Sequence, residues 1–272
     1  MKKLRIAYCS DLHIERGTLE LKNTENAEVL ILAGDIFVSH DLEEFNDSET
    51  SKRLKHRSTR IHNFISDCCK EFPHVIMICG NHESYTSDIL NTYTTISKFL
   101  KYNSNFHLLE NDVVNINDVI FVGGTMWTNM NGEDLETIHS ISKMLNDFRI
   151  IKKSHYKFTP LDALDIFKET TDYIDLMSTV YGNKNMVVVT HHSPSFKSTD
   201  PRFKDETILN GGFCSDLDQF IEDRPNIKTW IHGHLHNKSN YYVGTCNVLC
   251  NPRGYIGYEE CANNFKLEYF EV

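Results

Sequence analysis

The stretch His74-Val-Ile-Met-Ile-Cys-Gly-Asn-His-Glu83 joins a continuous apolar run to a short polar turn. An unbroken apolar run of this kind is typical of a strand that is buried on both faces of a sheet. The glycine allows a tight turn, and the amide, imidazole and carboxylate groups after it can bind metals or move protons. The stretch therefore predicts a buried strand with a polar site at its end.

Further apolar runs along the chain end in polar clusters of the same kind. Leu4 to Cys9 precedes an Asp-x-His cluster, Val29 to Ala33 precedes Gly-Asp, and Met186 to Thr190 precedes a pair of histidines. Ligands at the ends of neighbouring strands converge, so we expect the clusters to form one site. The full set consists of Asp11-x-His13, Gly34-Asp35, Gly80-Asn81-His82-Glu83, His191-His192 and Gly233-His234-x-His236.

Charged segments with helical periodicity separate the first strands. Residues 49–71 and 89–102 carry apolar residues at roughly helical spacing. Strands that alternate with helices predict an α/β layer sandwich. Two apolar runs, 113–116 and 119–123, flank Asn117-Asp118, which predicts a tight hairpin and a mixed sheet.

The second half of the chain begins with a long helical stretch. Residues 132–182 have apolar residues at helical spacing, with Pro160 near the start of a second helix. Because this stretch lies between the third polar cluster and the next strand, we expect a helical cap insertion within a single domain of residues 1–272. The closing strands are predicted to form the second sheet and cover residues 186–190, 229–232, 241–243, 247–250 and 265–270.

The composition is that of an ordinary globular protein. Apolar residues make up 40% and charged residues 24% of the chain, and residues 43–58 are expected to be its most mobile segment. No run approaches the roughly 20 apolar residues that span a bilayer, so no membrane span is predicted. Eight cysteines without a Cys-x-x-Cys pair favour reduced thiols and a cytoplasmic location.

The formal net charge of −10 disfavours a strong electrostatic grip on duplex nucleic acid. Bound divalent cations would invert the local potential, however, so a nuclease is kept as an alternative. The basic side chains that could line a groove for nucleic acid are Lys152, Lys153, Lys197, Arg202 and Lys204.

Taken in order, the polar clusters resemble those of the calcineurin-like metallophosphoesterase superfamily. The resemblance extends from residue 11 to residue 236 and implies a four-layer α/β/β/α sandwich of two mixed sheets around a dinuclear metal site. The strings that carry it are Asp-Leu-His (11–13), Gly-Asp-Ile (34–36), Gly-Asn-His-Glu (80–83), Val-Thr-His-His (189–192) and Gly-His-Leu-His (233–236).

The resemblance also implies which residues hold the metals. Carboxylate, amide and imidazole ligands suit two divalent ions, with Mn expected and Fe, Zn or Ni as alternatives. Asp35 would bridge the two ions, because its two oxygens can serve both cations. The first ion would be held by Asp11, His13 and His236, and the second by Asn81, His191 and His234.

The adjacent histidines 191 and 192 leave the choice of ligand open. His191 follows the apolar run directly, and neighbouring side chains on an extended segment point to opposite sides, so we prefer His191. His192 then lines the pocket or faces away. By the same alternation, His232 is expected to be a core or supporting histidine.

Other side chains are candidates for contacts with the substrate. The resemblance implies that His82 acts as general acid or transition-state stabiliser, with Glu83 or Asp11 orienting it. Arg253 either binds phosphate or is a surface arginine beside a Pro/Gly turn, and Arg149 is a second candidate. Aromatic residues that could stack on a base or sugar, or simply pack, are Tyr85, Trp127 and Tyr255.

The sequence thus predicts a metal-dependent phosphoesterase that hydrolyses phosphomonoesters or phosphodiesters through a metal-activated hydroxide. The cap and the acidic net charge favour a small phosphate ester as substrate. A nuclease acting on DNA or RNA and a phosphoprotein phosphatase are alternatives within the enzymes. A non-catalytic scaffold on the same fold is the alternative of another class.

Overall fold

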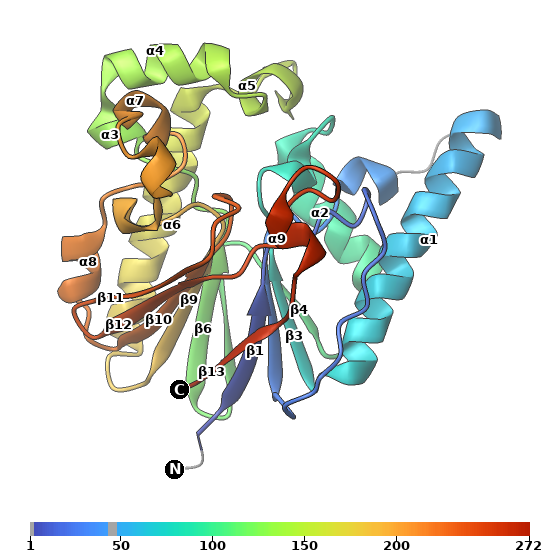
Figure 1. Cartoon of the computed structure of the whole chain (residues 1–272), viewed down its shortest axis with the longest axis horizontal. Coiled ribbons are helices and arrows are strands. Elements are labelled where there is room, and N and C mark those ends of the chain that lie inside the picture. Colours follow the sequence, from blue (N-terminus) through green and yellow to red (C-terminus); the bar gives the residue numbers. More distant parts are fainter. Residues whose placement is uncertain (1–2, 43–47) are drawn as a thin grey trace.

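The computed structural model describes residues 3–42 and 48–272, apart from the side chains of residues 48–54. In this part of the chain two large sheets pack face to face, and helices cover the outer face of each (Figure 1). The predicted four-layer α/β/β/α sandwich of two mixed sheets is confirmed. None of the helices in these ranges is long and apolar enough to cross a bilayer.

The first sheet has the strand order β13-β1-β2-β3-β4. Strands β1, β2, β3 and β4 are parallel to one another, whereas β13 at the edge is antiparallel to β1. Residues 265–270 were predicted in the second sheet, and this is wrong: the chain crosses back after Pro252, which bridges to Ser10, and ends on the first sheet. The strands are β1 (Arg5–Cys9), β2 (Val29–Ala33), β3 (His74–Ile78), β4 (Phe106–Leu109) and β13 (Glu268–Glu271).

The second sheet has the order β11-β12-β10-β9-β6-β5. β6, β9, β10 and β12 run parallel, and the predicted hairpin of β5 and β6 is confirmed as an antiparallel pair. The strands are β5 (Asp112–Ile116), β6 (Val119–Gly124), β9 (Met186–Thr190), β10 (Ile227–His232), β11 (Ser239–Val243) and β12 (Cys246–Cys250).

Strand β2 illustrates why the apolar runs become central strands. Leu30 and Leu32 pack into the core beneath the outer helices, whereas Ile31 packs between the two sheets. Because side chains alternate across a strand, only a continuous apolar run fills both cores. This requirement accounts for the unbroken runs that the sequence shows.

Helices α1 (Ser48–Glu71) and α2 (Ile89–Leu100) cover the first sheet (Figure 1). The Asp88 side chain caps α2 by accepting a hydrogen bond from the Leu90 amide. Of the segment predicted to be mobile, residues 43–47 lie outside the described residues, and the others fall in α1.

The predicted insertion, residues 132–182, divides into two parts in space. Helix α6 (Pro160–Val180) starts with a capping box of Thr159 and Asp162 and buries Phe167 and Ile174 against the second sheet. Together with α8 (Asp218–Glu222), it therefore belongs to the helical layer that covers the second sheet. The preceding helices lie beyond the strand ends (Figure 1) and comprise α3 (Met130–Glu133), α4 (Leu135–Met144) and α5 (Asp147–Ile150).

The remaining elements are short. A small hairpin, β7 (Lys152–Lys153) with β8 (Tyr156–Lys157), links α5 to α6. Helix α7 (Thr207–Asn210) packs beside α4, and α9 (Glu260–Asn263) precedes β13. The 3-10 turns are η1 (Ser39–Leu42), η2 (His82–Ser84), η3 (Phe196–Ser198) and η4 (Pro201–Phe203).

Candidate active site

The polar clusters meet at the carboxyl ends of the parallel strands of both sheets. Asp11 and His13 follow β1, Asp35 follows β2, and Asn81 follows β3, all of them buried. Residues after β9 and β10 approach from the second sheet. All seven predicted metal ligands come together here, and they are Asp11, His13, Asp35, Asn81, His191, His234 and His236.

The donor atoms fall into two groups, and donors from both lie near Asp35. In the first, Nε2 of His236 lies 3.3 Å from Nε2 of His13 and 3.3 Å from Oδ1 of Asp11. Asp35 falls within 4.8 Å of donors on both sides, namely His13 and His82 in one grouping and His191 and His234 in another.

In the second group, Oδ1 of Asn81 lies 3.0 Å from Nε2 of His191 and 3.1 Å from Nδ1 of His234. Oδ1 of Asp35 lies 3.2 Å from the same His191 nitrogen. Two ligand atoms that are each about 2.0–2.1 Å from one ion lie roughly 2.8–3.4 Å apart at octahedral or tetrahedral angles. The observed separations therefore fit atoms that share a metal ion.

The electrostatics also favour bound cations. Burial opposes protonation of His236, but the carboxylates of Asp11 and Glu259 outweigh this effect and raise the pKa of His236 to about 10. Burial likewise opposes protonation of His191, and Asp35 raises the pKa of this imidazole to about 9. Without metal, the site thus holds protons on imidazoles that are normally neutral. Divalent ions would take the place of these protons, because metal binding to histidine releases them.

The backbone at the ligands is unusual. Five of the seven ligand residues have positive φ angles: 51° at Asp11, 44° at His13, 56° at Asp35, 70° at His234 and 48° at His236. Residues other than glycine rarely adopt this conformation, which costs of order 1–3 kcal/mol and concentrates at functional sites. The fold holds these side chains inward at the expense of stability.

Two glycines make the close approach of the ligand loops possible. A Cβ atom at Gly80 would lie 2.1 Å from Oδ1 of Asp35, and one at Gly34 would lie 2.5 Å from Nδ1 of His191. Gly34 also has a φ of 82°. Any larger residue would push the ligands apart.

Glu83 ties two of the ligand loops together. Its buried carboxylate accepts hydrogen bonds from the backbone amides of Asp35, Ile36 and Phe37 and from that of Gly80, at 2.6–3.2 Å. The prediction that Glu83 orients His82 is therefore wrong, because backbone amides occupy both of its oxygens. Its function is to fix the loop after β2 against the loop after β3.

His82 faces the same cavity as the predicted ligands. Its Nε2 lies 3.0 Å from the Tyr255 hydroxyl and 3.8 Å from Oδ2 of Asp35, and its ring stacks on Tyr85 at 4.0 Å. Burial lowers its pKa to about 4. Tyr255 and Tyr85 thus hold the imidazole in place, and both line the cavity, which has a volume of about 340 Å³.

The structure distinguishes His191 from His192. His191 points at Asn81 and Asp35, whereas His192 stacks on Trp127 with ring centroids 4.9 Å apart. Trp127 is buried beneath α3–α5 and is not exposed for stacking on a substrate. His232 is fully buried, and its Nε2 contacts the Ser198 hydroxyl, as expected for a supporting histidine.

Arg253 lies beside the site but does not face the cavity. Its guanidinium donates to the carbonyl oxygens of Leu12, Gly17 and Thr18 at 3.1–3.2 Å. These bonds clamp the segment that follows the first ligand cluster, so the geometry does not support the predicted contact with phosphate. Arg149 is exposed and donates to the Lys143 carbonyl.

Three side chains near the site were not predicted. Glu259 contacts Nδ1 of His236 at 2.8 Å, Asp147 accepts from Nδ2 of Asn81 at 2.7 Å, and Arg16 stacks over Tyr255 at 4.3 Å. Each comes from a segment without a recognisable motif. Only the folded chain brings them to the ligands.

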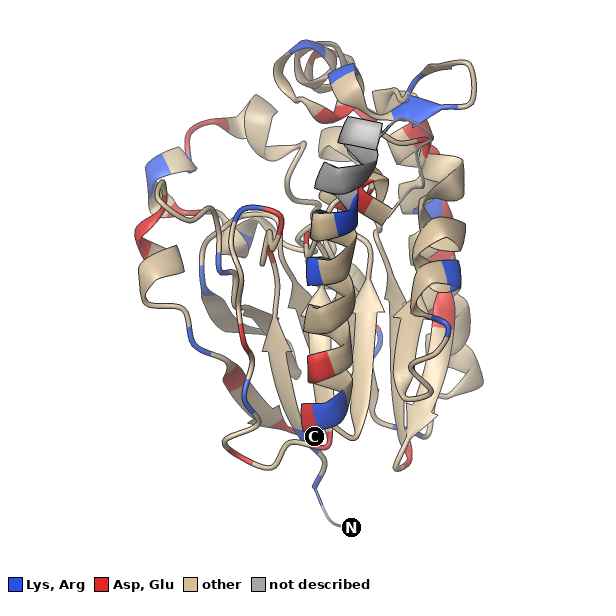
Figure 2. Ribbon diagram, turned by 90° about the vertical axis from the view of Figure 1, so that its right-hand side faces the viewer, with Lys and Arg blue, Asp and Glu red and all other residues tan. Residues whose placement is uncertain are grey.

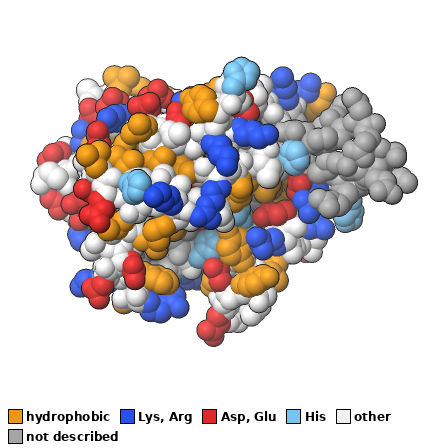
Figure 3. Space-filling view, turned by 90° about the horizontal axis from the view of Figure 1, so that it is seen from above, with side chains coloured by type: hydrophobic (Ala, Val, Ile, Leu, Met, Phe, Trp, Pro, Cys, Tyr) orange, Lys and Arg blue, Asp and Glu red, His pale blue; other side chains and the backbone are white. Residues whose placement is uncertain are grey.

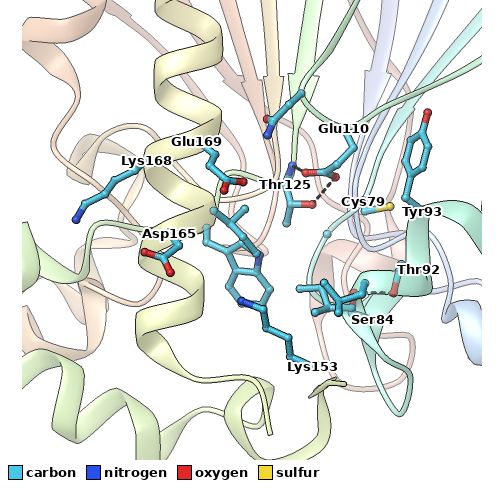
Figure 4. A pocket seen from close by; sticks show the side chains of 16 residues that line it. Cys79, Ser84, Thr92, Tyr93, Glu110, Thr125, Lys153, Asp165, Lys168 and Glu169 are labelled. Carbon is cyan, nitrogen blue, oxygen red and sulfur yellow. Dashed lines mark hydrogen bonds between the residues drawn. The ribbon is translucent and has the colours of Figure 1, made fainter. Parts of the chain in front are cut away.

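A larger cavity of about 540 Å³ is lined in part by Cys79 and Gly80, and Figure 4 shows the side chains around it. Its walls include the acidic residues Asp165 and Glu169 of α6 and the partly buried Glu110. Glu110 accepts from the amide and hydroxyl of Thr125 at 3.2 and 2.9 Å. Burial raises the pKa of Glu110 to about 7. None of the seven predicted ligands lines this cavity.

Comparisons with known proteins agree with this architecture. Over 222 residues the chain is 28% identical to the uncharacterized protein L509 of Acanthamoeba polyphaga mimivirus, a match that covers 75% of each chain. The fold is similar to that of phosphopantetheinyl hydrolase (PptH) from Mycobacterium tuberculosis, with a TM-score of 0.67, 13% identity, and coverage of 93% of this chain and 90% of that one. The sequence model of calcineurin-like phosphoesterases matches residues 4–238. Because this match includes most of the chain, the protein belongs to the calcineurin-like phosphoesterase family.

Proposed function

We propose that this protein hydrolyses small phosphomonoesters or phosphodiesters with two divalent metal ions, both of which are expected to be Mn. The observation that carries the proposal is the position of Asp35 between two groups of donor atoms. One carboxylate that serves two cations offsets their mutual repulsion. Family membership supports the same class of reaction.

The seven ligands would divide between the two ions. Asp11, His13 and His236 would hold the first, whereas Asn81, His191 and His234 would hold the second, with Asp35 shared. When bound, the ions would supply Lewis acidity and a nucleophile derived from water near neutral pH. The surrounding residues orient the ligands and bind the substrate.

His82 is proposed to act on the oxygens of the phosphate ester. Its Nε2 lies beside the cavity, 3.8 Å from Oδ2 of Asp35, where an N–H on this atom can donate a hydrogen bond to a phosphoryl or leaving-group oxygen. Tyr255 and Tyr85 prevent the ring from rotating, through a hydrogen bond and a stacking contact. Such fixed donors are most effective in a site that excludes water.

The size of the cavity supports a small substrate. We propose that α3–α5 form a cap within a single domain, because Met144, Leu145 and Asn146 close one side of the cavity of about 340 Å³. Phe213 and Leu235 add apolar surface. An ester with a modest apolar portion would fill this space. On the face of the molecule that is seen from above in Figure 3, Lys and Arg side chains lie near the middle, where they would attract the phosphate group of a substrate.

A nuclease remains the second candidate within the enzymes, and the surface charge disfavours it. Three of the basic side chains predicted for a groove are paired with carboxylates: Lys153 with Asp162, Lys197 with Asp218, and Arg202 with Asp200. On the face that carries α1, basic and acidic side chains are interspersed (Figure 2). Neither arrangement provides a continuous basic track for a nucleic-acid backbone.

The thiols support a reducing compartment. All eight cysteines are free, and most of them are buried. We propose a cytoplasmic location on this basis. Localisation of the tagged full-length chain tests it, and retention in an oxidising compartment would contradict it.

The activity is tested with a substrate panel in Mn at near-physiological salt. The panel contains p-nitrophenyl phosphate, bis(p-nitrophenyl) phosphate, cyclic nucleotides, and single- and double-stranded oligonucleotides, with Asp35→Asn as the control variant. We expect metal-dependent turnover of the small esters that the variant loses. Cleavage of oligonucleotides alone would favour the nuclease. No turnover by protein with bound metal would favour a non-catalytic scaffold.

A further inference from the structure

We infer that Asp147 is a positioning residue for the metal site: it fixes the orientation of Asn81 and makes binding of the second ion depend on the seating of the cap. The inference rests on the proposed two-metal function and adds a role for a residue outside the ligand clusters. Asp147 is the first residue of α5 and belongs to the segment beyond the strand ends.

The side-chain amide of Asn81 ends in an oxygen and a nitrogen of similar size; the oxygen accepts hydrogen bonds, whereas the nitrogen donates them. Its Oδ1 faces Nε2 of His191 and Nδ1 of His234, at 3.0 and 3.1 Å, and only this oxygen can bind a cation. Its Nδ2 donates to Oδ1 of Asp147 at 2.7 Å and to the Tyr85 hydroxyl at 3.2 Å. An ionised carboxylate accepts hydrogen bonds and cannot donate them. Asp147 therefore holds the amide nitrogen away from the metal position.

The surroundings of Asp147 show that burying its carboxylate next to Asn81 carries a free-energy cost. The residue is only 5% exposed, and no Lys or Arg forms an ion pair with it in the described part of the chain. A buried carboxylate without a basic partner is unfavourable unless other charges or hydrogen bonds compensate. The Asn81 amide supplies the hydrogen bond, and a divalent ion at the adjacent position would supply the compensating charge.

The cap determines where Asp147 lies. The next residue, Phe148, is buried in a small apolar core with Trp127 and Phe158, at centroid distances of 6.4 and 5.8 Å. This core packs beneath α3–α5 and is separate from the cores of the two sheets. If the cap shifts, Asp147 leaves Asn81 and the amide is free to rotate. Occupancy of the second metal position is in this way coupled to closure of the cap.

The test separates hydrogen bonding from packing at position 147. Asp147→Asn retains an oxygen that can accept from Asn81, whereas Asp147→Leu keeps a similar size and has no acceptor. The matched control is Asp134→Ala, which removes another cap carboxylate; this one caps α4 by accepting from the Thr137 amide. Mn binding to the metal-free full chain is measured by calorimetry and by elemental analysis, with circular dichroism to verify folding.

We expect the wild-type chain, Asp147→Asn and Asp134→Ala to bind two ions with similar affinities. Asp147→Leu should retain the first ion and bind the second about 10–100-fold more weakly, the usual loss when a hydrogen-bond partner of a ligand is removed. Wild-type affinity for both ions in Asp147→Leu would overturn the inference. Equal weakening in Asp147→Leu and Asp147→Asn would also overturn it, because loss of the negative charge, and not loss of the hydrogen bond, would then be the cause.

A second variant tests the coupling to the cap without changing the carboxylate. Phe148→Ala loosens the core that seats α5 and should weaken the second ion while sparing the first. Unchanged binding of both ions would refute the coupling. If the wild-type chain itself binds fewer than two ions, the proposed function fails, and this result is distinct from a failure confined to the variants.

Discussion

Glu259 lies against His236, with its Oε2 2.8 Å from Nδ1 of the imidazole, while Nε2 on the opposite side of the ring faces Asp11 at 3.3 Å. A carboxylate bound to one ring nitrogen fixes the tautomer and directs the other nitrogen toward a metal. Glu259 also accepts from the Tyr255 amide at 2.7 Å, so it connects His236 to the loop that carries Tyr255.

Replacing Glu259 is expected to affect the first metal position selectively. In Glu259→Ala, His236 loses its fixed orientation, and the affinity for the first ion should fall about 10–100-fold. Calorimetric titration with Mn measures this loss. Asp147→Leu serves as the complementary variant, because it should weaken the second ion. An equal loss at both positions in Glu259→Ala would contradict the assignment.

Removal of His82 should affect turnover without releasing the metals. His82→Ala is expected to retain both ions and to lose a factor of about 10²–10⁴ in kcat, the range for a positioned acid or base. If His82 protonates the leaving group, esters with very acidic leaving groups should be affected less. Equal losses across a series of leaving groups would indicate that His82 only stabilises charge.

Arg253 should contribute to stability more than to turnover. It donates to three backbone carbonyls, and hydrogen bonds to charged groups contribute about 1.5–3 kcal/mol each. Lysine cannot reach all three, so Arg253→Lys should lose about 3 kcal/mol and melt roughly 6–12 °C lower. Below its melting point its kcat should match the wild type. A large loss of kcat at unchanged melting temperature would restore the predicted contact with phosphate.

The local part of the site could be predicted from sequence, because each ligand lies within four residues of the end of a buried strand. Gly80, Asn81 and His82 illustrate this: the preceding apolar run fixes the strand end, and the glycine fixes the turn. The contacts of Glu259 and Asp147 could not be predicted, because they depend on how α9 and α5 pack on distant strands. The same limit left the two interpretations of Arg253 open.

The fold shows a similar division. The continuous runs of β2 and β9 were identifiable because both of their faces are buried. Strand β4 (Phe106–Leu109) was missed, since its first half is only partly buried and includes a histidine. Strand β13 was assigned to the second sheet together with the other closing strands, whereas its partner is β1 of the first sheet.

The partly buried side chain of Glu110 should make stability depend on pH. Burial raises its pKa from 4.5 to about 7, so the folded chain binds this proton more tightly than the unfolded chain. The resulting stabilisation is complete below pH 4.5 and is lost as the pH rises through about 7. Relative to Glu110→Gln, the wild type should lose about 2–3 kcal/mol of unfolding free energy between pH 5 and pH 8.

Urea denaturation of both chains at the two pH values measures this difference. Taking the difference between the chains cancels contributions from the metal site. Glu169→Gln is the control, because it removes an exposed carboxylate from the same cavity. A pH-independent difference between wild type and Glu110→Gln would contradict the assignment.

The central claim is that Asp35 joins two divalent ions in one site. The most direct measurement is the number of Mn ions per folded chain, determined by elemental analysis after reconstitution and removal of excess metal. We predict two ions in the wild type and a loss from both positions in Asp35→Asn, since this carboxylate serves both groups of donors. A folded wild-type chain that retains no Mn, Fe, Zn or Ni after reconstitution with each would contradict the account.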